Sequence, residues 1–165
     1  MKRINTIGLY VDGNDPSTGV VMNDQISKAV LIDNADADTL QVELPISDTA
    51  GELKGTVAVF GSTAPISPQM WEAVRQKWVD AYGTEPTREE LLVYCGFLAE
   101  GGNVPLDMLA GINMQTLNVF SGRVGSGDGA AIFLIEGCAQ LLVCVSANAS
   151  SQKARARAAF TLISE

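Results

Sequence analysis

The chain has 165 residues, of which 47% are hydrophobic and 18% charged, a composition typical of one globular domain that excludes a largely disordered protein. Its 11 basic and 19 acidic residues give a formal charge of -8, which argues against broad binding to nucleic acid or to anionic membranes. The chain contains no histidine, so it cannot itself build a Ser-His-Asp or Cys-His nucleophile system or the common histidine-containing metal sites.

The first sixty residues predict mainly β-strands. Residues 6–11 alternate apolar and polar side chains with the period of a strand that has one buried face. The clearest half-buried strand is 39–44, and Pro45 either ends it or places it at an edge. Further short strands are expected at 20–22, 29–32 and 55–61. Glycine- and aspartate-rich turns separate these strands.

Residues 67–101 change to helical periodicity. Ser67-Pro68 is typical of a helix N-terminus, and apolar residues then recur at helical spacing until Gly83, which favours a helix end. A second helix is predicted to begin at Thr87, because Glu90 completes a Thr-x-x-Glu capping box. The two helices are predicted to form a hairpin or a corner.

Strand character resumes at 116–120 and continues to 154–163. Two apolar segments, 130–135 and 139–145, flank Glu136-Gly137-Cys138 and are interpreted as a buried hairpin. Both alternating sets of positions in these segments are apolar, so we expect each strand to be covered on both faces.

The predicted fold class is therefore α+β: mainly antiparallel β, sandwich or barrel-like, with a two-helix insertion at about 67–101. One domain is expected over 1–165, with β structure at 5–61, a helical hairpin at 67–101 and β structure at 115–164.

Cytoplasmic synthesis of a soluble protein is predicted, because no signal peptide follows Met1. The longest apolar run, 130–147, is interrupted by polar residues and glycine, so no membrane-spanning helix is expected. The three cysteines, Cys95, Cys138 and Cys144, lack CxxC spacing and are interpreted as reduced, buried thiols.

Two loops have compositions that could bind ions. Asp33, Asp36 and Asp38 place three carboxylates within six residues, which makes them candidate calcium ligands, although the spacing excludes an EF-hand. Solvated turns are the alternative. The glycine-rich loop 122–129 could offer N–H groups to a phosphate, but it leads into a strand, so a mobile hairpin loop is the better interpretation. No cofactor and no catalytic residue is predicted.

Two sets of residues are candidate interface contacts. Lys153, Arg155 and Arg157 recur at every second position and would line one face of a strand, either pairing with acids of a neighbouring subunit or protecting an edge from aggregation. Trp71 and Trp78 lie on one helical stripe, which predicts core positions, or partner contacts if the helices project from the β layers.

Three functions remain open. The preferred one is a structural, self-associating assembly protein, such as a capsid, decoration or tail component of a viral particle, or a subunit of another protein shell. Its partners would be further copies of itself and other assembly proteins, with no membrane contact, and a virion is its expected location. The alternative is a small acidic module that occupies a basic site on a partner protein. The third is a small enzyme that works without histidine, although a non-enzymatic role is expected.

Overall fold

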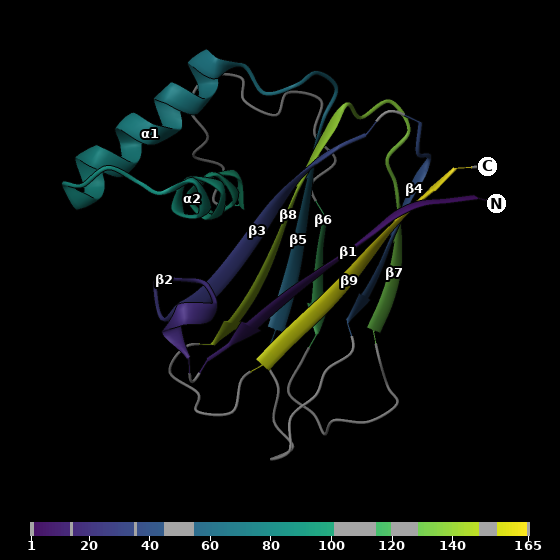
Figure 1. Cartoon of the computed structure of the whole chain (residues 1–165), viewed down its shortest axis with the longest axis horizontal. Coiled ribbons are helices and arrows are strands. Elements are labelled where there is room, and N and C mark those ends of the chain that lie inside the picture. Colours follow the sequence, from purple (N-terminus) through teal and green to yellow (C-terminus); the bar gives the residue numbers. More distant parts are fainter. Residues whose placement is uncertain are drawn as a thin grey trace.

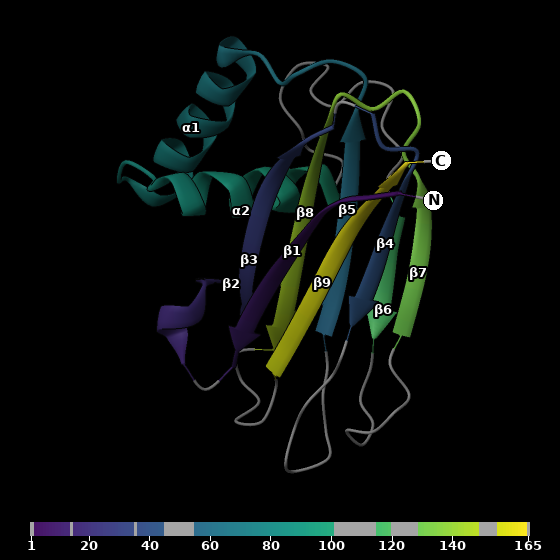
Figure 2. The ribbon, with the colours of Figure 1, turned by 45° about the vertical axis from the view of Figure 1, so that its right-hand side comes forward.

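Two antiparallel sheets face each other, and two helices lie against the outer side of one of them (Figures 1 and 2). The computed structural model describes residues 2–13, 15–34, 36–44, 55–100, 115–119, 129–148 and 155–164. Within them, sheet 1 contains, in spatial order, β1 (Lys2–Asp12), β9 (Arg155–Ser164), β4 (Thr39–Leu44) and β7 (Gly129–Leu134). Sheet 2 contains β2 (Val20–Met22), β3 (Gln25–Asp33), β8 (Gln140–Asn148), β5 (Gly55–Ser62) and β6 (Gln115–Val119). The 3-10 turn η1 (Pro16–Thr18) precedes β2, and α1 (Pro68–Tyr82) and α2 (Arg88–Glu100) follow β5.

This architecture confirms the predicted fold class. All the strand pairs in the two sheets are antiparallel, as expected for a sandwich. The two helices are inserted between β5 and β6, at the predicted place in the chain. Neither helix described by the structure is long and apolar enough to cross a membrane.

Strand β8 is covered on both faces, as its apolar sequence predicts. It lies between β3 and β5 in the middle of sheet 2. Leu141, Val143 and Val145 belong to the core between the two sheets. Leu142 and Cys144, at the alternate positions, belong to a second core beneath the helices. A strand that contributes to two cores must be apolar on both faces.

The predicted hairpin between 130–135 and 139–145 is wrong. Strand β7 pairs with β4 in sheet 1, whereas β8 pairs with β3 and β5 in sheet 2. Gly137, with φ of 86°, makes the turn that carries the chain from one sheet to the other. On either side of it, the Ile135 N–H donates to the Asp38 carbonyl and the Ala139 N–H donates to the Ser62 carbonyl.

This separation also corrects the expected burial of β7. Its Phe133 is buried in the core between the sheets, but the next residue, Leu134, is 71% exposed. Strand β7 is therefore covered on one face at this end, unlike β8. Strands β7 and β8 thus contribute Phe133 and Val143 to the same core from opposite sheets.

The predicted starts of both helices and the predicted end of α1 are confirmed by their local hydrogen bonds. The predicted end of α2 at Gly101-Gly102 lies outside the described residues. The Ser67 hydroxyl accepts from the Met70 N–H at 3.2 Å, and Gly83 ends α1 with φ of 75°. At α2, the Thr87 hydroxyl accepts from the Glu90 N–H at 3.2 Å, while the Glu90 carboxylate accepts from the Thr87 N–H at 2.9 Å. Each helix start is thus specified by residues within four positions of it.

The two helices differ in how they meet the sheets. Figure 2 shows α2 against sheet 2 and α1 farther from the strands, on the outer side of the molecule. Leu92, Cys95 and Leu98 of α2 are buried in the second core, whereas α1 buries only Val74 and Trp78. Helix α2 is therefore the cover of sheet 2, and α1 is an outer element supported by α2.

Candidate functional site

Trp71 and Trp78, predicted to share one stripe, have different surroundings. Trp78 is 5% exposed and packs against Tyr82 and Tyr94, with ring centroids 4.3 Å and 5.3 Å away. Its indole N–H is buried without a hydrogen-bond partner among the described residues. Trp71 is only half-buried and lines a hollow beside α2. Trp78 is therefore a core residue in this structure, and Trp71 is the tryptophan that an outside molecule can reach.

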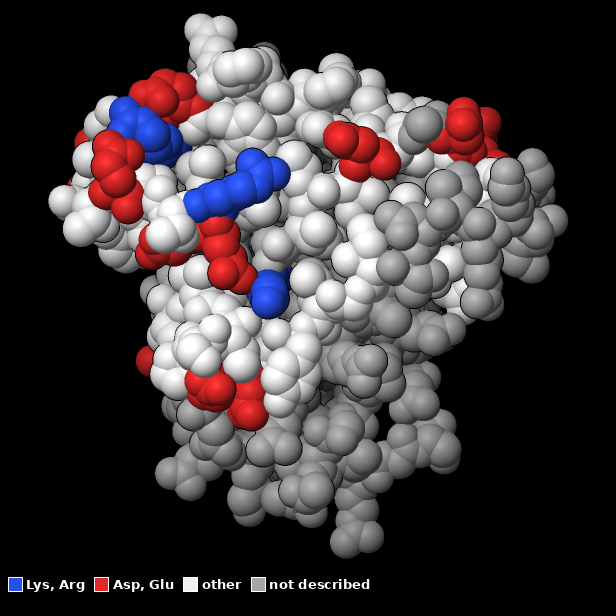
Figure 3. Space-filling view, in the orientation of Figure 1, with Lys and Arg blue, Asp and Glu red and all other residues white. Residues whose placement is uncertain are grey.

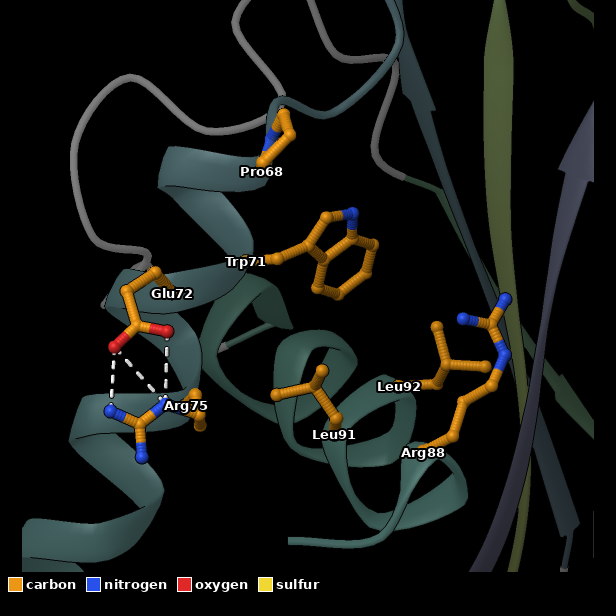
Figure 4. Close-up of a pocket in the computed structure, with 7 residues that line it drawn as sticks. All are labelled: Pro68, Trp71, Glu72, Arg75, Arg88, Leu91 and Leu92. Carbon is orange, nitrogen blue, oxygen red and sulfur yellow. Dashed lines mark hydrogen bonds and ion pairs between the residues drawn. The ribbon is translucent and has the colours of Figure 1, made fainter. Parts of the chain in front are cut away.

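The hollow between α1 and α2 has a volume of about 390 Å³. Figure 4 shows the Trp71 indole reaching from α1 into the space above α2, with Leu91 and Leu92 below it. We call this space the helix hollow and define it by the residues that line it: Pro68, Trp71, Glu72, Arg75, Arg88, Leu91 and Leu92.

The two arginines of the helix hollow are in different electrostatic states. Arg75 Nε lies 2.9 Å from a Glu72 carboxylate oxygen, and its Nη1 lies 2.7 Å from Glu85 Oε1. The hydrogen bonds that Arg75 donates to Glu72 and Glu85 raise the pKa of Arg75, and the one donated to Glu72 lowers the pKa of that carboxyl. Arg88 makes no hydrogen bond or ion pair with any residue that the structure describes. Among the described residues that line the hollow, Arg88 is therefore the cation that no carboxylate pairs with.

Acidic and basic side chains alternate over the helices rather than forming one acidic face. Figure 3 shows Lys and Arg beside Asp and Glu on the part of the surface formed by α1 and α2. One such pair, Lys28 and Glu89, joins β3 to α2 at 4.0 Å. On this face the charges of the helices thus lie in mixed clusters, and the acidic-module hypothesis stays a prediction.

The basic row at 153–157 falls partly outside the described residues. Lys153 lies outside them, and the structure places Arg155 and Arg157 by backbone register alone. Arg155 is opposite Asp12 of β1, and Arg157 is opposite Tyr10. Cross-strand neighbours share a face, so an acidic residue of the same chain occupies the position next to Arg155. Contact of this row with another subunit stays a prediction.

The three aspartates of the calcium hypothesis are not brought together as ligands. Asp33 Oδ1 accepts a hydrogen bond from the Gln140 side-chain amide at 2.8 Å, and Asp36 is exposed. Asp38 binds through its backbone to Ile163 and Ile135. Within the described ranges no three His, Cys, Asp or Glu side chains form a group that could hold a metal ion. The loop 121–128, which holds most of the glycine-rich candidate, lies outside those ranges.

Strand β7 presents an edge that the sequence did not predict. Among the described strands it pairs with β4 alone. The Ile135 N–H donates to Asp38, the residue before β4, and backbone groups alternate in direction along a strand. Those of Ala130, Ile132 and Leu134 therefore point away from β4. Leu134 has the largest exposed fraction of any large apolar residue described. We call these outward backbone groups the β7 edge.

The other described edges are shorter, more polar or partly closed. In β1 the Asp12 N–H donates to the Thr18 hydroxyl at 2.9 Å, and the Asp12 carbonyl accepts from the Asp15 N–H at 3.0 Å. Strand β2 has three residues, and β6 contains Gln, Thr and Asn. Strand β7 contains six residues with no charge, no proline and no polar side chain. Charges and prolines are the usual protection of a strand edge, and β2 and β6 also lack them. Among the described edges, β7 is longer than these two and, unlike β6, has no polar side chain.

Sequence reasoning missed both the β7 edge and the polar part of the helix hollow. The alternation of buried Phe133 with exposed Leu134 could not be read from a segment that is apolar at every position. Arg88 lies next to the Thr87 cap and showed no pattern that distinguishes a binding residue from a solvated one.

No protein-family model matches this chain, and no curated protein matches it either.

Proposed function

We propose that the protein is a structural, self-associating assembly protein, such as a capsid, decoration or tail component of a viral particle, or a subunit of another protein shell. Further copies of the chain, together with other assembly proteins, are its partners. The observation that carries the proposal is the β7 edge with its exposed Leu134.

The first support is chemical. A strand edge without charge or proline offers alternating N–H and C=O groups to another strand, and such pairing is a common way for chains to associate. Figures 1 and 2 both place β7 at the margin of the molecule, on the side away from the helices. A strand of another chain could therefore approach it without displacing α1 or α2.

The second support is that the edge is complementary to itself. In an antiparallel pair of β7 strands centred on Ile132, Ala130 of one copy lies opposite Leu134 of the other. Ile132 lies opposite its own counterpart. The outward groups of all three residues then find partners, and no like charges meet. Sheet 1 would continue from one copy into the next, which is a two-fold arrangement of the kind most homo-oligomers use.

The test is the native mass of the protein, measured by light scattering after size exclusion over a range of concentrations. The wild-type chain is expected to give a mass of two or more subunits. Leu134→Lys introduces a charge at the exposed end of the edge and is expected to shift the mass toward that of one subunit, with the far-ultraviolet circular dichroism unchanged.

Val21→Lys is the matched control. Val21 is 54% exposed on β2, the edge strand of sheet 2, so the same charge is added at a comparable apolar surface position. This variant is expected to keep the wild-type mass. A wild-type protein that is monomeric at high concentration contradicts self-association, and a Leu134→Lys protein that assembles like the wild type contradicts the role of the β7 edge.

A further inference from the structure

The helix hollow has features of a ligand site that are independent of the β7 edge. Figure 2 shows the helices and β7 on opposite sides of the molecule, so neither site covers the other. The volume of about 390 Å³ lies in the range of about 300–1,000 Å³ that is usual for small-molecule sites. The hollow is therefore large enough for a small organic ligand.

The walls of the hollow define the apolar part of such a ligand. Leu92 is buried and Leu91 is half-buried on α2, and the half-buried Trp71 indole faces them from α1 (Figure 4). An aromatic ring with aliphatic side chains below it favours a flat or branched apolar group. Trp71 also has an indole N–H that makes no hydrogen bond with the described residues.

The charges of the hollow define the polar part. Arg88 has no anionic partner in the described chain, whereas Arg75 is neutralised by Glu72 and Glu85. A guanidinium binds a carboxylate through two parallel hydrogen bonds. At the opposite wall, Glu72, Arg75 and Glu85 together keep one net negative charge, which would repel a second anionic group of a ligand placed beside them. The hollow therefore matches a ligand with one carboxylate rather than a dianion.

We propose that the helix hollow binds a small monocarboxylic acid with an apolar body, whose carboxylate contacts Arg88 and whose body lies between Trp71 and Leu91. Arg88 is exposed, and water competes for its hydrogen bonds. The expected dissociation constant is therefore on the order of millimolar.

The test uses 4-phenylbutyrate as the probe and 4-phenylbutanamide as a neutral analogue of nearly the same shape. The chain has two tryptophans, so its indole N–H groups give two resonances in a nitrogen-15 correlation spectrum. The acid is expected to shift the Trp71 resonance and leave that of the buried Trp78 in place. The amide is expected to bind about tenfold more weakly, because it cannot form the charge-assisted hydrogen bonds.

Arg88→Gln is expected to weaken binding of the acid about tenfold and to leave binding of the amide unchanged. Lys77→Gln is the matched control: it removes the same charge from an exposed position of α1 that does not line the hollow, and it should bind the acid like the wild type. An acid that moves neither indole resonance overturns the proposal, and so does equal binding of acid and amide. The comparison of the two probes needs no substitution and stays decisive even if Arg88→Gln fails to fold.

Discussion

Gly96 of α2 lies so close to Cys144 of β8 that a Cβ atom at position 96 would overlap the Cys144 sulfur. The next atoms in reach are the Cys144 Cβ at 3.7 Å and a ring carbon of Phe60 at 3.8 Å. The absence of a side chain at position 96 is therefore what allows α2 to lie directly on sheet 2. Since the second core lies beneath α2, the close approach of Gly96 to Cys144 determines how tightly α2 packs on sheet 2.

Gly96→Ala should destabilise the protein. Alanine favours a helix over glycine by about 1 kcal/mol, but the added methyl group must displace α2 or the Cys144 side chain. Overpacking of this kind costs about 1–3 kcal/mol. We expect a net loss in the free energy of unfolding, measured by guanidinium denaturation. A variant as stable as the wild type would show that α2 can move outward without loss.

Cys144→Ala should partly rescue Gly96→Ala. Removal of the sulfur leaves the Cys144 Cβ at 3.7 Å from the new methyl group, which is an ordinary contact. The double variant should therefore lose less stability than the two single variants together. Strictly additive losses would rule out this contact as the cause.

Val143→Asp should prevent folding. Val143 is fully buried between the two sheets, and a carboxylate there would have no partner in that apolar core. The expected loss exceeds about 4 kcal/mol, which is comparable to the whole stability of a domain. Val21→Asp, at a 54% exposed position, should remain folded in the same circular dichroism measurement. A folded Val143→Asp protein would contradict the packing described above.

Gln140 joins three elements, and its loss should loosen the start of α1. Its side-chain carbonyl accepts from the Ile66 N–H at 2.8 Å, and its amide donates to Asp33 at 2.8 Å. Gln140→Leu would leave the Ile66 N–H without this acceptor, at a cost of about 1–3 kcal/mol. Gln76→Leu is the control, because Gln76 is exposed and bonds to Asp80 on the same helix. Equal thermal stability of the two variants would refute the bridging role.

The buried thiol of Cys95 should make stability decrease in alkaline solution. Burial raises the pKa of Cys95 from 9.0 to about 12. Between these values the unfolded chain loses the thiol proton and the native chain keeps it, so the free energy of unfolding falls as the pH rises from 9.0 to about 12.

Urea denaturation at pH about 8 and about 10 measures this effect. Cys95→Ala should lose less stability between the two pH values than the wild type. The same loss in both proteins would assign the alkaline sensitivity to other groups.

Local features of the fold could be predicted from the sequence because their causes are local. Both ends of α1 and the start of α2 follow from Ser67, Gly83 and the pair Thr87 and Glu90, all of which act within one turn. The partner of β7 could not be predicted in this way. A segment that is apolar at every position fits the middle of a sheet as well as its edge, and only the packing of distant strands decides between them.

The residues of the candidate sites also divide into those that a local sequence pattern predicts and those that only the folded structure brings together. Trp71 was a candidate from its helical spacing, and the structure places it beside a hollow. Arg88 and Leu91 become its neighbours only because α2 turns back beneath α1 after Gly83. Trp71 lies on another helix than Arg88 and Leu91, and no periodicity of the sequence relates positions on two different helices. Their contact could therefore not be predicted from the sequence.

The pairing of β1 with β9 has a consequence for how the chain folds. Lys2 is opposite Ser164 and Asp12 is opposite Arg155. Strand β1 therefore cannot form these pairs until β9 has been synthesised. Among the described strands, only β2 and β3 are paired across a short turn. At about 5–20 residues per second, a ribosome adds β9 on the order of ten seconds after β1. During synthesis the β1 segment therefore lacks its strand partner. Folding is expected to be slow and to benefit from chaperones.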